Sequence, residues 1–195
     1  MRIKQRQNAS EKKRAVEQAV QKAKELGPIP DPVCVESCPE FDASVGCHRD
    51  CQFAPVRLSS EADDYPLETL IAPLVFELKK LGVFYPCWSC EGHNDREGKL
   101  WKIPRVWFYS DSVVHLRALS TAINELTLKR LLSVKWQLVV SHSDDDNADT
   151  TFSLEPRMGA DEVGLDQLRS DIVTISTKLE TEFQKACAKL SNNAG

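Results

Sequence analysis

Long apolar runs are missing from this sequence of 195 residues. A membrane-spanning helix needs about 18 or more consecutive apolar residues, so the sequence predicts no membrane span. The basic N-terminus leads into a mixed polar segment and not into the apolar core of a secretory signal. We therefore expect a cytoplasmic protein, in which the seven cysteines serve metal ligation or thiol chemistry and do not form disulfides.

Three familiar catalytic motifs are also absent. The chain has no glycine-rich phosphate loop, no serine nucleophile elbow and no His-Glu-x-x-His helix, so the enzyme classes that depend on them receive no support. The net charge of −4 gives the surface as a whole no general attraction for nucleic acid. Charge is uneven, however, because residues 1–27 carry eight Lys or Arg and three Glu. This basic arm on an acidic body predicts an anionic partner for the arm.

Three regions follow one another along the chain. Residues 1–27 predict a basic helical arm, whose helix over residues 8–26 ends at Gly27 and Pro28. Residues 28–60 hold five prolines and four of the seven cysteines, which predicts an irregular region that a metal ion ties down. Residues 61–195 predict a body that forms one domain with residues 28–60.

Apolar periodicity predicts the elements of the body. Helices are expected over residues 64–81, 112–132 and 161–190, and strands over residues 83–88, 103–109, 134–141 and 150–154. The order α-β-β-α-β-β-α favours an α+β fold of two layers, in which helices cover one face of a four-stranded, mostly antiparallel sheet. Pro73 is expected to kink the first helix, and Pro86 indicates an edge strand. The last helix is expected to pack on its own sheet, with a homodimer through this helix as the alternative.

Cys34-x3-Cys38 and Cys47-x3-Cys51 are two equally spaced pairs, separated by eight residues. Four thiolates from two close pairs are a typical ligand set of a structural zinc ion. Zinc held by Cys34, Cys38, Cys47 and Cys51 is therefore the main prediction, with His48 as a spare ligand. An iron–sulfur cluster, which also takes four thiolates, a disulfide-linked helical hairpin and a chance group of free thiols remain as alternatives.

A second group of candidate residues lies in the string Cys-Trp-Ser-Cys-Glu-Gly-His at residues 87–93. It places thiols, a carboxylate and an imidazole after a predicted strand, where binding sites are commonly built. His142 ends another predicted strand, so we expect Cys90, Glu91, His93 and His142 to gather at one edge of the sheet. Glu91 or His93 would then serve as general acid or base. There are three alternatives for Cys87 and Cys90. They could form a redox pair, they could be further ligands of the metal ion at the first cysteine cluster, or they could be ordinary buried thiols.

The string Ser89-Cys90-Glu91-Gly92-His93 resembles a motif of small uncharacterised bacterial and phage proteins, where it also lies between two strands. That resemblance covers residues 66–110 and implies no known activity. Three short strings occur in the same order as in the wybutosine tRNA methyltransferase family, to which they are similar: Ser89-Cys90-x-Gly92, Val140-Ser141-His142 and Leu154-Glu155-Pro156. That family has a basic residue in place of His93, and the strings are too short to imply an activity.

The sequence thus predicts an intracellular metal-binding protein, with zinc as the expected ion and an iron–sulfur cluster as the alternative. One functional hypothesis is an enzyme that uses Cys90, Glu91, His93 and His142 in acid–base or metal-assisted chemistry. The other is a metal-stabilised binding module whose basic arm contacts an anionic partner. A pocket around His93 would favour the enzyme, and a solvated loop at residues 89–93 would favour the module.

Overall fold

A computed structural model describes residues 48–142, 150–159 and 163–192, together with Arg14, Glu17, Gln18 and Gln21. These four single residues are helical and exposed. The rest of the predicted arm and most of residues 28–60 lie outside the described residues. Within the described part of the chain, no helix is long and apolar enough to cross a membrane.

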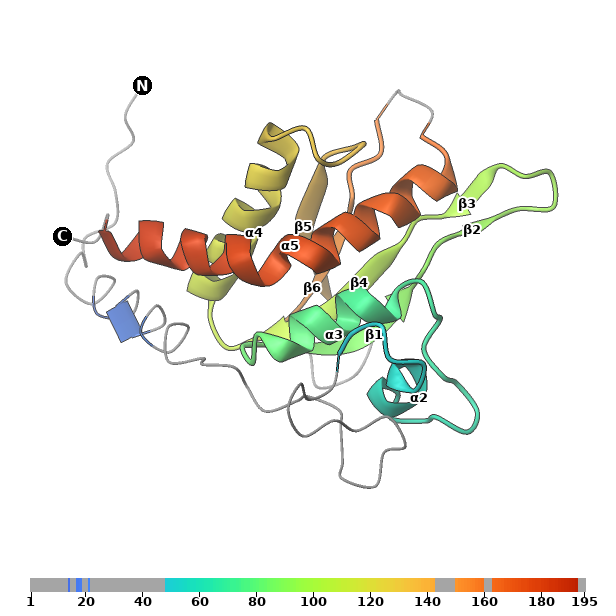
Figure 1. The fold of residues 1–195 in the computed structure, drawn as a ribbon, viewed down its shortest axis with the longest axis horizontal. Coiled ribbons are helices and arrows are strands. Elements are labelled where there is room, and N and C mark those ends of the chain that lie inside the picture. The colour runs from blue at the N-terminus through green and yellow to red at the C-terminus, as the bar shows by residue number, and fades with distance from the viewer. Residues whose placement is uncertain are drawn as a thin grey trace.

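The fold is α+β, as the sequence predicts. The elements in chain order are α2 (Ala54–Leu58), α3 (Ala72–Lys80), β1 (Phe84–Cys90), β2 (His93–Asn94), β3 (Leu100–Lys102), β4 (Arg105–Ser110), α4 (Val113–Leu128), β5 (Trp136–His142), β6 (Thr150–Pro156) and α5 (Leu165–Asn192) (Figure 1). Four strands form one sheet in the order β1-β4-β6-β5, and each neighbouring pair is antiparallel. The edges of this sheet are therefore β1 and β5.

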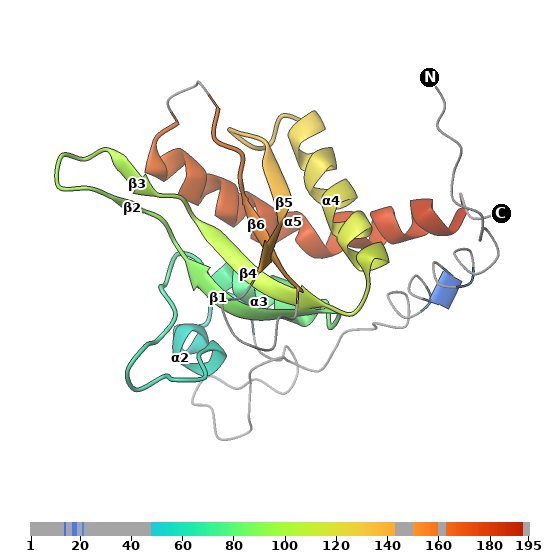
Figure 2. The same cartoon turned by 180° about the vertical axis from the view of Figure 1, so that it is seen from behind.

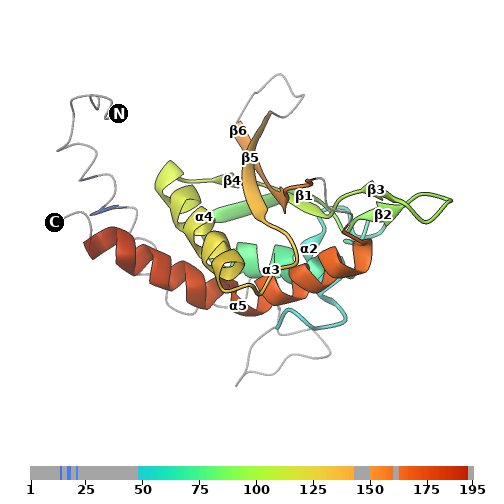
Figure 3. The same ribbon diagram turned by 90° about the horizontal axis from the view of Figure 1, so that it is seen from above.

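Helices α3, α4 and α5 cover one face of the sheet (Figure 3). The ring of Phe84 on β1 shows how the two layers meet, because it lies edge-on to Phe108 of β4 at 5.3 Å and to Phe183 of α5 at 5.6 Å. Aromatic pairs in this geometry add to the free energy gained by burial. The apolar stripe expected on the last helix is confirmed, since all of its predicted inward residues are buried: Leu165, Leu168, Ile172, Ile175, Leu179, Phe183 and Ala186.

One buried carboxylate joins α5 to the start of β5. The two oxygens of Asp171 accept hydrogen bonds from the Ser133 backbone amide at 2.8 Å, from Ser133 Oγ at 2.9 Å and from Trp136 Nε1 at 2.9 Å. A buried carboxylate is tolerated when its lone pairs are occupied in this way. Asp171 therefore acts as a structural tie between the helical layer and the sheet.

The first helix of the body is shorter than its apolar pattern predicts. It begins at Ala72, so that Pro73 lies in its first turn and does not kink it. Proline is tolerated there because the amide hydrogens of the first turn have no partner within the helix. Residues 64–71 form an irregular segment with a turn at each end instead. The side chain of Glu68 consequently belongs to a loop that faces the end of β1.

Strand β1 contains a bulge. Pro86 pairs with Phe108 and Trp88 pairs with Trp107, so Cys87 is an extra residue between two regular pairs. The prediction that Pro86 marks an edge strand is confirmed, since β1 has a neighbour on one side only.

The hairpin β2–β3 was not expected from the sequence, and neither was the short helix α2. In the hairpin His93 pairs with Lys102, and the ribbon extends beyond the main sheet (Figure 2). The Asp95 side chain accepts hydrogen bonds from two backbone amides of the turn, and Gly98 adopts a φ of 82°. His93 is therefore held at the start of a strand and does not lie in a free loop.

Candidate metal centre

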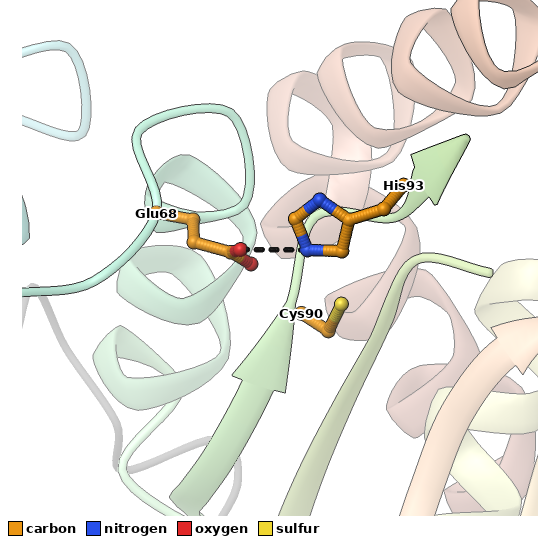
Figure 4. A group of neighbouring side chains, drawn as sticks. All are labelled: Glu68, Cys90 and His93. Carbon is orange, nitrogen blue, oxygen red and sulfur yellow. Dashed lines mark ion pairs between the residues drawn. The ribbon is translucent and has the colours of Figure 1, made fainter. Parts of the chain in front are cut away.

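Glu68, Cys90 and His93 gather where the loop before α3 meets the end of β1 (Figure 4). A carboxylate oxygen, the thiol sulfur and an imidazole nitrogen all lie within 4.8 Å of one another. These are the three kinds of ligand atom that zinc takes from proteins. The side chains of His93 and Glu68 are 38% and 36% exposed, whereas Cys90 is buried. The group is therefore closed on its sulfur side and open to solvent on the other.

The backbone at Gly92 brings Cys90 and His93 to the same place. Its φ of 83° lies in the left-handed region that favours glycine. A Cβ at this position would lie 2.7 Å from Leu165 Cδ1 and 2.9 Å from Pro104 Cδ. Both the turn and the close approach of α5 therefore require glycine between the two candidate ligands.

Glu68 and His93 contact each other directly. Glu68 Oε1 lies 2.8 Å from His93 Nε2, and Glu68 Oε2 accepts a hydrogen bond from the Glu91 backbone amide at 2.7 Å. A tetrahedral zinc ion needs its ligand atoms about 3.3–3.6 Å apart, given bonds of about 2.0–2.3 Å. The observed spacing fits such an ion after side-chain shifts of about 1 Å.

Burial raises the pKa of the Cys90 thiol, and the Glu68 carboxylate adds to this rise. A hydrogen bond from the Gly92 backbone amide and the positive charges of Lys102 and Arg105 oppose the rise in this pKa. Since only the thiolate is a good metal ligand, a metal ion binding here would displace the thiol proton.

The carboxylate of Glu91 supports this group and is not part of it. Its Oε1 accepts a hydrogen bond from Arg169 Nη2 at 3.0 Å, and its Oε2 accepts one from the Leu70 backbone amide at 3.0 Å. Arg169 also donates to the Gly92 carbonyl at 3.1 Å. Glu91 and Arg169 thus connect the end of β1, the loop before α3 and helix α5. Contacts of this kind hold metal ligands in position in known metal sites.

His142 does not join these residues. Because each neighbouring pair of strands is antiparallel, β1 and β5 run in opposite directions. Cys90 ends β1 at the end of the sheet where β5 begins, whereas His142 ends β5 and pairs with Thr150 at the opposite end. The prediction of a joint site that includes His142 is therefore wrong, since it required the two strands to end on the same side.

The other candidate cysteines lie away from Glu68 and His93 or outside the described residues. Cys34, Cys38 and Cys47 lie outside the described residues, so the zinc site at the first cluster stays a prediction. Its fourth member, Cys51, is buried. Cys87 is exposed at the bulge of β1, and it is not one of the three side chains that come together around His93.

Glu68 is the member that sequence reasoning missed. Periodicity placed it inside a helix, 22 residues before Cys90, with no spacing that links the two. The signal that was available is Pro73, which marks the first turn of α3 and so places Glu68 in the preceding loop.

A pocket of about 810 Å³ lies beside Glu68, along the free edge of β1. Its wall includes Arg57 and Lys79 as well as Tyr65 and Trp88. The pocket reaches the candidate metal centre through Glu68, so a small molecule held there would lie next to the group.

Comparisons with protein-family models, with curated proteins and with solved structures find no match to this chain. The interpretation of Glu68, Cys90 and His93 accordingly depends on their donor atoms and on the geometry described above.

Proposed function

We propose that this protein binds a divalent transition-metal ion, zinc in the first place, through Glu68, Cys90 and His93. The observation that carries the proposal is the gathering of one oxygen, one sulfur and one nitrogen ligand atom within 4.8 Å. Zinc accepts all three kinds of ligand, whereas calcium and magnesium prefer oxygen alone. A thiolate in the group therefore favours zinc over the harder cations.

Three protein ligands are typical of a catalytic zinc site, and four of a structural one. An ion held by three ligands keeps a position for water or substrate, and its charge lowers the pKa of a bound water to about 7. The exposure of Glu68 and His93 and the adjacent pocket agree with an accessible ion. If this protein is an enzyme, metal-assisted chemistry is therefore a better proposal than acid–base chemistry by Glu91, whose two oxygens are both engaged.

The first cysteine cluster is a separate proposal that depends on sequence alone. Zinc held by Cys34, Cys38, Cys47 and Cys51 would be structural, and an iron–sulfur cluster at the same thiolates is the alternative. With both zinc sites filled, the chain would carry two zinc ions that differ in ligand set.

Metal content and cobalt spectroscopy of Cys90→Ser test the proposed centre. We expect this variant to lose about one equivalent of zinc and to weaken zinc affinity by about 100-fold or more, because even outer contacts of metal sites contribute 10- to 100-fold. Cobalt substituted at the site should lose its sulfur-to-metal charge-transfer absorption together with Cys90.

Cys87→Ser is the matched control, since Cys87 lies on the same strand outside the group. It should bind the metal like the wild type. His93→Ala should behave like Cys90→Ser. Unchanged zinc content and an unchanged cobalt spectrum in both Cys90→Ser and His93→Ala would contradict the proposal.

A further inference from the structure

The sheet face opposite α3, α4 and α5 presents aromatic and basic side chains. Strand alternation and register place Trp88 of β1 and both Arg105 and Trp107 of β4 on this face. Trp88 is 45% exposed, and Tyr85, on the same strand, is 49% exposed. Single exposed aromatic residues are ordinary, but a contiguous group of them marks a binding surface.

Trp88, Trp107 and Arg105 form one cluster. The two indole rings lie 4.9 Å apart between centroids and are tilted by 46°. The guanidinium carbon of Arg105 lies 5.6 Å from the Trp88 ring and 5.9 Å from the Trp107 ring, which is within the range of cation–π attraction. Among the described residues, the Arg105 guanidinium has no carboxylate partner, and its buried Nε lacks a hydrogen-bond acceptor. This cluster therefore combines stacking surface with a positive charge that no carboxylate of the described residues neutralises.

Further cations continue from Arg105 along the same end of the sheet. Arg157 directly follows β6 and Lys135 directly precedes β5; both are exposed, and the Arg157 amide donates to the Lys135 carbonyl at 2.7 Å. No ion pair of these two side chains is found within the described ranges. Neighbouring strands lie about 4.8 Å apart, so the three cations span about 10 Å across the sheet. The one carboxylate among them, Glu155, accepts a hydrogen bond from Ser153 Oγ at 2.7 Å.

We propose that this face binds single-stranded nucleic acid, with bases stacked on Trp88 and Trp107 and phosphates along Arg105, Arg157 and Lys135. Stacking on aromatic side chains beside a line of cations is the general way in which proteins hold single strands. A duplex is a poorer occupant because its bases are already stacked and paired. The inference goes beyond the proposed metal site and does not depend on it.

The test measures the fluorescence anisotropy of a labelled single-stranded oligonucleotide of roughly 12 nucleotides, as DNA and as RNA, against the full chain at low salt. A 12-nucleotide strand is long enough to cover a typical single-strand site. We expect Trp88→Ala to weaken binding by about 5- to 150-fold, the range for one stacked base. Trp88→Phe should keep most of the affinity, because a phenyl ring still stacks.

Arg105 is tested in the same assay. Arg105→Gln should weaken binding and reduce the dependence of affinity on salt, because one phosphate contact is lost. Arg105→Lys should keep the salt dependence but not the full affinity, since an ammonium does not stack as a guanidinium does. Any contribution of the basic arm at residues 1–27 is the same in all these variants and does not affect their ratios.

Two control variants leave the sheet face intact. Arg117→Gln removes an exposed charge from α4, and Val173→Ala removes most of an exposed apolar side chain from α5, both on the helical side. Both should bind like the wild type, and the melting curve of every variant should show that it is folded at the temperature of the assay.

Three outcomes would overturn the inference. The first is the absence of oligonucleotide binding by the wild type at low salt. The second is an equal loss of affinity in Trp88→Ala and the two controls. The third is a wild-type dimer that Trp88→Ala converts to a monomer in light scattering, because the occupant of the face would then be a second copy of the chain.

Discussion

Two of the polar contacts between helix α5 and the rest of the protein differ in kind. At Asp171 a carboxylate is buried, and its oxygens receive donors from Ser133 and Trp136. Half a turn earlier, Arg169 reaches Glu91 and the Gly92 carbonyl, beside three side chains that leave an opening to solvent. One place is saturated with hydrogen bonds, and the other keeps ligand atoms available.

This difference separates a structural polar group from a candidate functional one. A buried carboxylate that neutral donors saturate has no capacity left for a ligand, and its contribution is to the free energy of folding. Side chains that face one another with exposed lone pairs contribute less to folding, but they can bind. Substitutions at Asp171 should therefore lower the free energy of unfolding and leave metal affinity unchanged. Substitutions around Glu91 should lower metal affinity and leave the free energy of unfolding nearly unchanged.

The largest effect is expected at Asp171. Asp171→Ala would leave the buried Trp136 Nε1 without an acceptor, at a cost of about 1–3 kcal/mol, and would remove the hydrogen bonds of the Ser133 donors, which water can reach. The free energy of unfolding should therefore fall by about 2 kcal/mol or more. Urea unfolding measures this change. Asp171→Asn keeps one acceptor oxygen and should lose less. Zinc content per folded chain should stay unchanged in both variants. A loss of zinc from a variant that is still fully folded would contradict the purely structural role of Asp171.

A smaller effect, on zinc affinity and not on stability, is expected at Arg169. Arg169→Gln removes the charge that holds Glu91 and the Gly92 carbonyl, so zinc affinity should fall by about 10- to 100-fold. The free energy of unfolding should change by about 1 kcal/mol or less, because the side chain is partly exposed. Isothermal titration with zinc measures the affinity. Lys178→Gln, an exposed change on the same helix, is the control and should bind zinc normally.

The smallest effect concerns the C-terminal half of α5 and depends on pH. Hydrogen bonds from Lys129 and Lys185 lower the pKa of Glu182 below its ordinary value of 4.5. The charged carboxylate therefore stabilises the fold above about pH 4.5, and this contribution is lost as the pH falls through the lowered pKa. Because both lysines are largely exposed, the contribution should be about 1 kcal/mol or less. Unfolding measured from pH 7 to pH 3 should show a shallower decline for Glu182→Gln.

The sequence predicted the parts of the fold that depend on local patterns. The stripe from Leu165 to Ala186 identified the buried side of α5, because helical periodicity is a property of neighbouring residues. The antiparallel sheet followed from strands that come in pairs. Ser112 caps α4 with its side chain, so this helix begins at Val113, one residue after the start that periodicity predicted. Such errors at element ends are small, since alternative caps differ by only about 1 kcal/mol.

The candidate site was predicted only in part, because it depends on contacts between distant segments. The string at residues 87–93 identified Cys90 and His93, both near the end of β1. Glu68 comes from another loop, and nothing in the spacing links it to Cys90. His142 was assigned to the wrong end of the sheet, since the direction of a strand relative to a non-neighbour depends on the full strand order.

The bulge in β1 has a consequence for how this segment tolerates changes in length. Pro86 and Trp88 would pair with Phe108 and Trp107 in an unbroken register if Cys87 were deleted. Such a deletion would leave Trp88 and Cys90 on the same sides of the sheet as now. A deletion on the far side of the bulge, at Ser89, would instead reverse the side on which Cys90 lies. In distant sequences that share this strand, a gap is therefore to be expected at Cys87, and a search pattern should allow one missing residue there.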